Sequence, residues 1–225
     1  MTSQHTSSIG NGLSNFSVGS ILSRRYRGNV RTASGKLRFA VVCSSNMNRS
    51  MEAHSILSKK GFTVSSFGTG TKVKLPGPAA NMPNMYSFST TYAAIYNDLA
   101  GKDFNLYTQN GLLNMLERNK QIKPRPERFQ ECTETFDVVI CCEERVFNQA
   151  MEYMISREIK SEHICHIINI DIQDNHEEAT LGAFMMCDIC RQLEMCRNLN
   201  DDIEDVLSTF EEKSKREILH VPFFY

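Results

Sequence analysis

Residues 37–60 read LRFAVVCSSNMNRSMEAHSILSKK, an apolar run followed by a polar loop and an amphipathic run. Residues 37–43 are rich in β-branched and aromatic side chains, which predicts a short strand buried on both faces. Residues 50–60 have the apolar spacing of a helix, which Gly61 stops. Residues 62–67 predict a second strand. This order of strand, loop, helix and strand is the βαβ unit of an α/β fold.

The rest of the chain continues this alternation. We expect strands at 136–141, 164–170 and 218–225, and helices at 90–100, 106–119, 143–155 and 175–213, the last interrupted near 197–202. Asn175 followed by Glu178 forms a capping-box pattern at the start of that last region. Gly- and Pro-rich residues 68–83 predict a loop or a small hairpin near 71–78. The sequence therefore predicts a three-layer α/β fold, in which helices flank a mostly parallel central sheet.

Length and composition are those of one ordinary domain. The chain has 225 residues, of which 41% are hydrophobic and 23% charged, so it can bury a hydrophobic core without disulfides or a structural metal to stabilise it. The formal net charge of −1 gives no global field that would favour direct binding of nucleic acid or an anionic membrane. No apolar run reaches the roughly 18–20 residues that span a bilayer, which excludes a transmembrane protein.

Eight cysteines are spread along the body of the chain: Cys43, Cys132, Cys141, Cys142, Cys165, Cys187, Cys190 and Cys196. Their spacing is not that of a small disulfide framework, and no secretory signal precedes them. We therefore expect free thiols in a reducing compartment, most of them acting as small buried hydrophobic groups.

Residues 1–35 differ from the rest of the chain. They are rich in Ser and Gly, contain no Asp or Glu, and carry a basic cluster at 24–27. Such a segment buries too little apolar surface to offset its ordering entropy, which predicts a disordered tail before a single domain at 36–225. A mitochondrial-type transit peptide, or a nuclear-localisation signal at the basic cluster, is the alternative.

The loop between the first predicted strand and helix has the spacing C-x5-R-S, formed by Cys43, Arg49 and Ser50. Five intervening residues let the backbone curl into a ring of N–H donors, and the helix N-terminus adds partial positive charge at the same point. Such a ring binds a tetrahedral oxyanion. The predicted phosphate-binding residues are Ser44, Ser45, Asn46, Met47, Asn48 and Ser50.

Within this ring, Cys43 and Arg49 have chemical roles. Arg49 can close the ring with a bidentate guanidinium fork on two oxygens of the anion. The same donors stabilise a thiolate at Cys43, and the Ser50 hydroxyl is placed to hydrogen-bond its sulfur. A thiolate held below phosphorus is a nucleophile, which predicts phosphoryl transfer to Cys43 and hydrolysis of a phosphocysteine. We expect no metal or other cofactor, because the backbone donors and Arg49 supply the positive charge.

The reaction also needs a general acid for the leaving oxygen. Open α/β sheets bind ligands outside the carboxyl ends of their strands. Asp171 and Asp174 directly follow the strand predicted at 164–170. We predict Asp174 as the acid and Asp171 as its supporting partner. The alternative for either is a carboxylate that only stabilises the start of the next helix.

Several stretches resemble known proteins. Cys43-x-x-Asn46-x-x-Arg49-Ser50 resembles the loop of the low-molecular-weight protein tyrosine phosphatases. The wider match resembles more closely the eukaryotic phosphatases of the RNA polymerase II C-terminal domain, which share this fold. The stretches that carry it are VVCSSN (41–46), RSMEAH (49–54), SFGTGT (66–71), VKLPGP (73–78), YTQNG (107–111), IKPRPERF (122–129) and DIQDNHEEATLGAF (171–184).

This resemblance implies a single cysteine-phosphatase domain at 36–225. It also implies a substrate and a cellular location for that domain. Members of the family remove phosphate from the fifth-position serine of the heptad repeat in the polymerase tail, with the following serine–proline bond in cis. Asp174 matches the family's acid. The substrate groove is implied at Lys74, Leu75, Pro76, Tyr107 and Met115, the last two lining its proline pocket. The resemblance also implies a metal-independent nuclear enzyme, with the cytoplasm as a second location, that binds a scaffold protein of mRNA 3′-end processing.

Four other interpretations stay open. Plain phosphotyrosine specificity is disfavoured, because Ser45 stands where tyrosine phosphatases have Gly and no Asp-Pro pair supplies the acid. A binding-only or weakly active copy of the phosphatase is a second alternative. An arsenate reductase would need resolving cysteines such as Cys187 and Cys190, whose helical spacing favours a place in the core. A zinc-binding module would use Cys187, Cys190, His163, Cys165 and His166.

Overall fold

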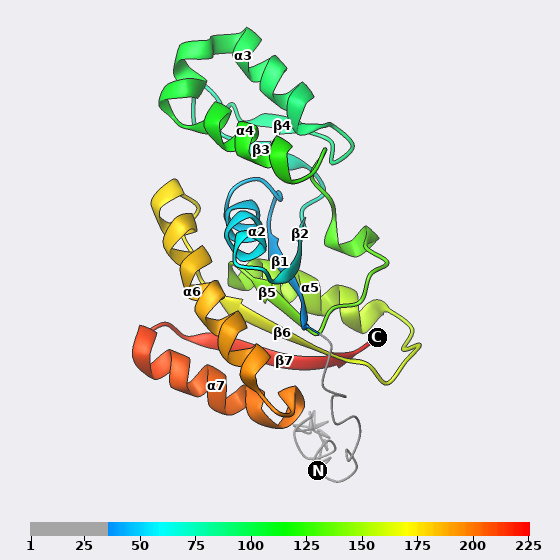
Figure 1. Ribbon diagram of the computed structural model, residues 1–225. Helices are drawn as coiled ribbons and strands as arrows, with labels where there is room; N and C mark the ends of the chain where they lie inside the picture. The colour runs from blue at the N-terminus through cyan, green and yellow to red at the C-terminus, as the bar shows by residue number, and fades with distance from the viewer. Residues whose placement is uncertain (1–35) are drawn as a thin grey trace, which may run out of the picture.

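A five-stranded sheet in the order β2-β1-β5-β6-β7 forms the centre of the molecule (Figure 1). Its strands are β1 (Arg38–Cys43), β2 (Thr63–Gly68), β5 (Val138–Cys141), β6 (Ile164–Ile170) and β7 (Ile218–Phe224). The first four are parallel and β7 pairs antiparallel with β6, which confirms the predicted mostly parallel sheet. The computed structural model describes residues 36–225, so the tail predicted at 1–35 lies outside the described residues and stays a prediction.

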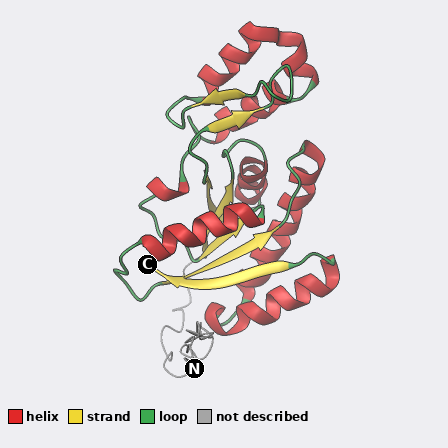
Figure 2. Cartoon of the chain, turned by 180° about the vertical axis from the view of Figure 1, so that it is seen from behind, coloured by secondary structure: helices red, strands yellow, loops and turns green. Residues whose placement is uncertain are grey.

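Helices cover both faces of this sheet (Figures 1 and 2). One face carries α2 (Arg49–Lys59), α6 (His176–Met195) and α7 (Leu199–Ser214), and the other carries α5 (Glu144–Ser156) and the 3-10 turn η1 (Phe129–Glu131). In β1, Phe39 packs in the core shared with α2 and α6, whereas its neighbour Ala40 packs in the core shared with α5. A strand between two helical layers must be apolar at every position, which explains the continuous run. The three-layer prediction is confirmed.

A hairpin–helix module, residues 73–122, stands above the carboxyl ends of the parallel strands (Figure 1). It contains β3 (Val73–Leu75), β4 (Asn84–Tyr86), α3 (Tyr92–Gln109) and α4 (Leu112–Ile122). The module has its own apolar core, which also takes in Met47 and Met51 from the main body. The hairpin predicted near 71–78 is confirmed, but its second strand lies later in the chain, at 84–86.

The helices of this module agree only in part with the prediction. α3 has a kink at Asp103, inside the gap predicted between 90–100 and 106–119, but it continues to Gln109, and α4 begins only at Leu112. The helix predicted at 106–119 is therefore wrong, because it joins the end of α3 to α4 across Gly111. Gly111 separates the two helices with a φ of +80°, in the left-handed region that glycine enters without a steric cost. Apolar residues continue at helical spacing across this break, so their pattern does not reveal it.

The start of α6 and the break before α7 are as predicted. The Asn175 side chain accepts a hydrogen bond from Glu178 N at 2.9 Å, whereas the Glu178 carboxylate pairs with Arg216 at 3.1 Å and not with the cap. α6 ends at Met195, and Asn198 caps the start of α7. Over the described part of the chain, no helix is long and apolar enough to cross a membrane.

Six of the eight cysteines are buried. Cys187 and Cys190 are 3% and 0% exposed and lie in the core between the sheet and α6, so their helical spacing is that of a core face. Cys165 lies on the opposite side of the sheet, in the core shared with α5. The ligands of the alternative zinc site are therefore divided between the two faces. Within residues 36–225, no group of three or more His, Cys, Asp or Glu side chains is arranged to hold a metal ion.

Two stacked histidines join β6 to β7. The ring centroids of His166 and His220 are 5.2 Å apart, and His166 Nδ1 lies 3.0 Å from His220 Nε2. His166 Nε2 lies 2.9 Å from Asn200 Oδ1 in α7. Burial lowers the pKa of both imidazoles, that of His220 to about 4, where His166 acts in the same direction. Both rings are therefore neutral in the folded protein at pH 7.

We expect acidification to lower the free energy of unfolding through this pair. A histidine with a pKa of about 4 when folded and about 6.5 when unfolded takes up its proton only as the chain unfolds. This difference in pKa therefore does not lower the free energy of unfolding above pH 6.5. Below pH 6.5 it lowers the free energy of unfolding progressively as the pH falls towards 4, by about 1–2 kcal/mol at pH 5 for His220. Urea unfolding at pH 7.5 and pH 5 measures this loss.

His220→Gln should reduce the difference between the free energies of unfolding at pH 7.5 and pH 5. His176→Gln, at an exposed position, should leave that difference unchanged. The same pH dependence in the wild type and both variants would contradict the assignment to the histidine pair.

Candidate active site

Three loops meet around Cys43 at the carboxyl edge of the sheet. β1 ends at Cys43, Glu143 follows β5, and Asp174 follows β6. Parallel strands end at the same edge, so residues far apart in sequence become neighbours there. A cavity of about 390 Å³ opens at this edge, and Cys43, Met47, Asn48 and Asp174 contribute to its lining. The structure therefore brings together the predicted nucleophile, loop and acid.

The Cys43 loop, residues 44–48, has bonded carbonyls and free N–H groups. The carbonyls of Cys43 and Ser44 accept hydrogen bonds from the two N–H groups of residues 69 and 70, at 3.0 and 2.9 Å. The N–H groups of residues 45–48 donate to no residue within 36–225. Asn46 has a φ of 53°, a left-handed conformation in which successive N–H groups turn to one side. The loop therefore offers the ring of free donors that an anion requires.

Polar side chains hold the loop in this shape. Asn46 is fully buried, and its Nδ2 donates to Ser50 Oγ at 3.0 Å and Ser66 Oγ at 3.2 Å. Asn46 Oδ1 accepts from Glu127 N at 3.0 Å. Ser50 Oγ lies 3.0 Å from Cys43 Sγ, the contact that the sequence spacing predicted. A hydroxyl at this distance can donate to a thiolate and so stabilise it.

The side chains of the two loop serines make contacts of their own. Ser44 Oγ donates to Glu143 Oε1 at 2.8 Å, and Arg145 donates to the same hydroxyl at 2.7 Å. Ser45 Oγ accepts from Lys74 N at 3.2 Å, which ties the loop to β3 of the module. Both hydroxyls therefore position the loop, and its backbone remains the part that faces an anion.

Arg49 lies in the first turn of α2 and is 3% exposed. Its Nη1 donates to Cys142 O at 3.2 Å, Ile172 O at 2.9 Å and Glu143 Oε2 at 2.9 Å. Its Nη2 lies 3.4 Å from Asp174 Oδ2, and its Nε is buried without a hydrogen-bond partner among the described residues. The edge formed by Nε and Nη2 is therefore the part of the guanidinium that can bind two anion oxygens side by side.

Opposite charges surround this guanidinium. Burial lowers the pKa of Arg49, but Cys43, Asp174 and Glu143 together outweigh burial and hold the pKa above its ordinary value. Burial raises the pKa of Glu143, but Arg49 and a hydrogen bond from Ser44 reverse the shift and hold this pKa below its ordinary value. Arg49 and Glu143 are therefore both charged at neutral pH.

The two predicted carboxylates occupy different places. Asp174 lines the cavity beside Cys43, its side chain is 58% exposed, and its Oδ1 accepts from Asn48 Nδ2 at 3.0 Å. Asp171 lies outside that lining, and its Oδ1 accepts from Glu144 N, at the start of α5, at 3.1 Å. The geometry favours Asp174 as the acid, whereas Asp171 satisfies a free N–H at the start of a helix.

The hairpin–helix module forms the opposite wall of the cavity. Four of the five predicted groove residues line it: Lys74, Leu75, Pro76 and Met115. The structure does not bring Tyr107 to this wall. Tyr107 is 1% exposed, and its hydroxyl accepts a hydrogen bond from Asn84 Nδ2 at 2.9 Å inside the module. Tyr107 therefore supports the hairpin from inside the module, on the side away from the cavity.

The described residues also match a known family. Residues 37–225 match the family described as Ssu72-like protein. The chain belongs to the Ssu72-like family. The mouse RNA polymerase II C-terminal domain phosphatase SSU72 is 60% identical over 192 residues, which cover 85% of this chain and 99% of the mouse protein. The Caenorhabditis elegans protein with the corresponding name, ssup-72, is 54% identical over 194 residues, which cover 85% of this chain and 98% of that protein.

Solved structures of Ssu72 from Drosophila melanogaster share this fold. One, described as the serine phosphatase of the RNA polymerase II C-terminal domain, has a TM-score of 0.83 at 51% identity and covers 84% of this chain and 100% of its own. Another contains Ssu72 and Symplekin with a cis peptidomimetic peptide of that domain, phosphorylated on the fifth-position serine. It has a TM-score of 0.82 at 49% identity and covers 85% of this chain and 100% of its own.

Several residues of this Ssu72-like site were not predicted from the sequence. Glu143 binds Arg49, and three side chains of the module donate to carbonyls of the Cys43 loop: Tyr92, Arg118 and Asn119. Glu143 could have been predicted from the sequence, because it follows the strand predicted at 136–141 and so lies at the carboxyl edge of the sheet. The three module residues carry no comparable signal in the sequence.

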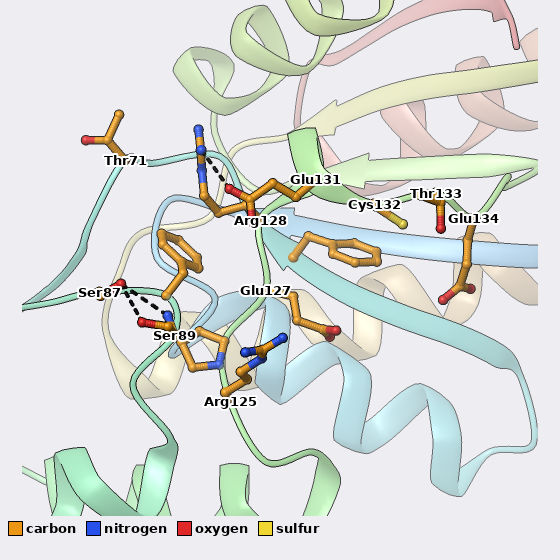
Figure 3. Close-up of a pocket in the computed structure, with 13 residues that line it drawn as sticks. Thr71, Ser87, Ser89, Arg125, Glu127, Arg128, Glu131, Cys132, Thr133 and Glu134 are labelled. Carbon is orange, nitrogen blue, oxygen red and sulfur yellow. Dashed lines mark hydrogen bonds and ion pairs between the residues drawn. The ribbon is translucent and has the colours of Figure 1, made fainter.

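A second cavity, of about 430 Å³, lies between residues 87–89 and 125–134 of this Ssu72-like chain (Figure 3). Its lining does not include Cys43, and it mixes basic with acidic side chains. Arg128 pairs there with Glu131 at 3.0 Å. The nucleophile and the acid that the sequence predicts, Cys43 and Asp174, therefore line the first cavity and not this one.

Proposed function

We propose that this chain is a cysteine-dependent protein phosphatase that acts on the fifth-position phosphoserine of the heptad repeat in the RNA polymerase II C-terminal domain. The observation that carries the proposal is the placement of Cys43 at the base of a loop with free N–H groups, beside the free edge of Arg49. The substrate is supported by the names of relatives 54–60% identical and by the phosphoserine peptide in the fly Ssu72 structure.

In the first step, the Cys43 thiolate attacks phosphorus and the bond to the serine oxygen breaks. The N–H groups of residues 45–48 and the Nε–Nη2 edge of Arg49 bind the three non-bridging oxygens, where negative charge accumulates. The carboxylic acid of Asp174 gives its proton to the leaving oxygen, because a serine alkoxide is a poor leaving group. The products are a neutral serine side chain and phosphocysteine.

In the second step, water attacks the phosphocysteine. Asp174, now a carboxylate, takes a proton from this water, and inorganic phosphate leaves as the S–P bond breaks. The sulfur returns as a thiolate, which the Ser50 hydroxyl stabilises from 3.0 Å. Both steps need positive charge only where the backbone donors and Arg49 already supply it, so the mechanism requires no metal.

The module wall supplies the substrate specificity. Leu75, Pro76 and Met115 place apolar surface in the cavity that contains Cys43, which suits the proline that follows the phosphoserine. The peptide in the fly structure is a cis peptidomimetic, so we assign the cis serine–proline bond to the substrate of this chain too. Symplekin in that structure supports a scaffold partner in mRNA 3′-end processing. Because the proposed substrate is part of RNA polymerase II, we also propose a nuclear location for the protein.

We expect the purified chain, assayed in EDTA, to dephosphorylate a heptad peptide with fifth-position phosphoserine at least about tenfold faster in kcat/KM than one with second-position phosphoserine or a phosphotyrosine peptide. Differential contacts with the residues beside the phosphoserine are the physical reason. Preference for phosphotyrosine would instead indicate a general tyrosine phosphatase. Binding of the phosphopeptides without turnover of any would indicate a binding-only copy.

A further inference from the structure

We infer that Arg118 and Asn119, on α4, are positioning residues that hold the Cys43 loop in its anion-binding conformation. The inference rests on the proposed function, because it assumes that the loop binds a phosphoryl group. α4 belongs to the hairpin–helix module and not to the layers around the sheet (Figure 1). The module that supplies the groove wall therefore also supports the catalytic loop.

Both side chains donate to carbonyls of the loop. Asn119 Nδ2 lies 2.8 Å from Met47 O. Arg118 Nη2 lies 3.0 Å from the same oxygen and 3.4 Å from Asn48 O. Asn119 is fully buried and Met47 is 2% exposed, so water does not readily replace these donors. Two donors from α4 thus converge on one loop carbonyl.

The direction of a carbonyl decides the direction of the next N–H group. The peptide unit is planar and trans, so its C=O and N–H bonds point to opposite sides. Holding the Met47 carbonyl towards α4 turns Asn48 N–H the other way, towards the bound anion. Tyr92, on α3, acts in the same way on Met47 N–H, because its hydroxyl donates to Asn46 O at 2.8 Å. The module thereby orients two of the free N–H groups.

The donors on α4 are themselves fixed. Arg118 Nε and Nη2 donate to Asn119 Oδ1 at 3.0 and 2.9 Å, which turns the amide nitrogen of Asn119 towards the loop. The Arg118 guanidinium also pairs with Glu52 in the first turn of α2, and the two side chains are 19% and 14% exposed. These contacts therefore link α4, the loop and α2.

Met115 connects this link to the substrate groove. It lies one turn before Arg118 and Asn119 on α4, and it lines the cavity that contains Cys43. A substrate side chain that packs on Met115 therefore contacts the helix that orients the loop. One helix, α4, therefore contributes both to the groove wall and to the support of the loop.

Asn119→Asp tests the link, because it keeps the size of the side chain and the acceptor for Arg118 but removes the donor to Met47 O. We expect the inhibition constant of inorganic phosphate to rise about tenfold. We also expect a similar fall in the ratio of the rates at which iodoacetate and iodoacetamide alkylate Cys43, since only the first reagent is an anion. Asn119→Ala should show the same changes without an added charge.

Glu117→Gln is the matched control, because Glu117 is an exposed residue of α4 that pairs with Lys120 away from the loop. It should leave both readouts unchanged. Wild-type values of both readouts in folded Asn119→Asp and Asn119→Ala would overturn the inference. If neither variant stays folded, Arg118→Lys serves instead, because it keeps a charge facing Glu52 and loses the guanidinium donors. Wild-type values in that variant would overturn the inference equally.

Different experimental results would contradict the proposed function and the positioning role of α4. Wild-type protein that cleaves no phosphopeptide would remove the proposed function. Inorganic phosphate that protects wild-type Cys43 from iodoacetate would still report anion binding by the loop, so the variants would still test the role of α4.

Discussion

Cys43→Ser should lower turnover of the phosphoserine peptide by on the order of a thousandfold or more, while the peptide still binds. The serine hydroxyl is not ionised at neutral pH and is a far weaker nucleophile than a thiolate. The donors that bind phosphate are backbone N–H groups and Arg49, and this substitution leaves them in place. Steady-state kinetics measures the loss, and calorimetry with the phosphopeptide measures the retained binding.

Cys196→Ser is the matched control for this experiment. Cys196 follows α6 and is half-buried, away from the active-site cavity. Its Sγ donates to Gln192 O at 3.5 Å, a contact that a serine hydroxyl can also make. The control should keep wild-type turnover. Cys43→Ser with a tenth or more of wild-type turnover would contradict the assignment of the nucleophile.

Asp174→Asn should lower turnover of the phosphoserine peptide by about 10²–10⁴-fold, and turnover of a nitrophenyl phosphate ester much less. A serine alkoxide needs a proton as it leaves, whereas a nitrophenolate leaves without one. An asparagine at this position can still accept the hydrogen bond from Asn48 that Asp174 accepts at 3.0 Å. The ratio of the two losses, measured as kcat/KM for each substrate, reports the acid role specifically.

Asp171→Asn separates the two carboxylates. An asparagine can still accept from Glu144 N, as Asp171 does at 3.1 Å, so this variant should keep wild-type kinetics on both substrates. Equal losses on the two substrates in Asp174→Asn would remove the acid role from Asp174. A loss confined to the phosphoserine peptide in Asp171→Asn would transfer that role to Asp171.

The elements that could be predicted from the sequence are those with strong local signals. β1 and α2 were predicted because a continuous apolar run passes directly into a helical pattern across the Cys43 loop. β6 lies at 164–170 as predicted, since it is an interior strand, between β5 and β7, and is buried on both faces. The contact between Ser50 and Cys43 could be inferred because it is local and follows from the spacing of the loop.

The remaining features depend on contacts between distant residues. The boundary at Gly111 is hidden because α3 and α4 bury one shared apolar core, so the pattern continues through the turn. The three-residue strands β3 and β4 are too short to show a period. The contact from Asn119 to Met47 spans 72 positions and that from Arg49 to Glu143 spans 94, and no local pattern encodes such pairs.

The division of the active-site cavity between two parts of the chain has a consequence for inhibitor design. A compound that fills only the Cys43 loop contacts backbone donors and one arginine, groups that any enzyme with the C-x5-R spacing presents. Leu75, Pro76 and Met115 lie on the opposite wall and come from the module at 73–122. A compound that joins a phosphate mimic to an apolar group reaching this wall should therefore distinguish this enzyme from phosphatases that lack the module.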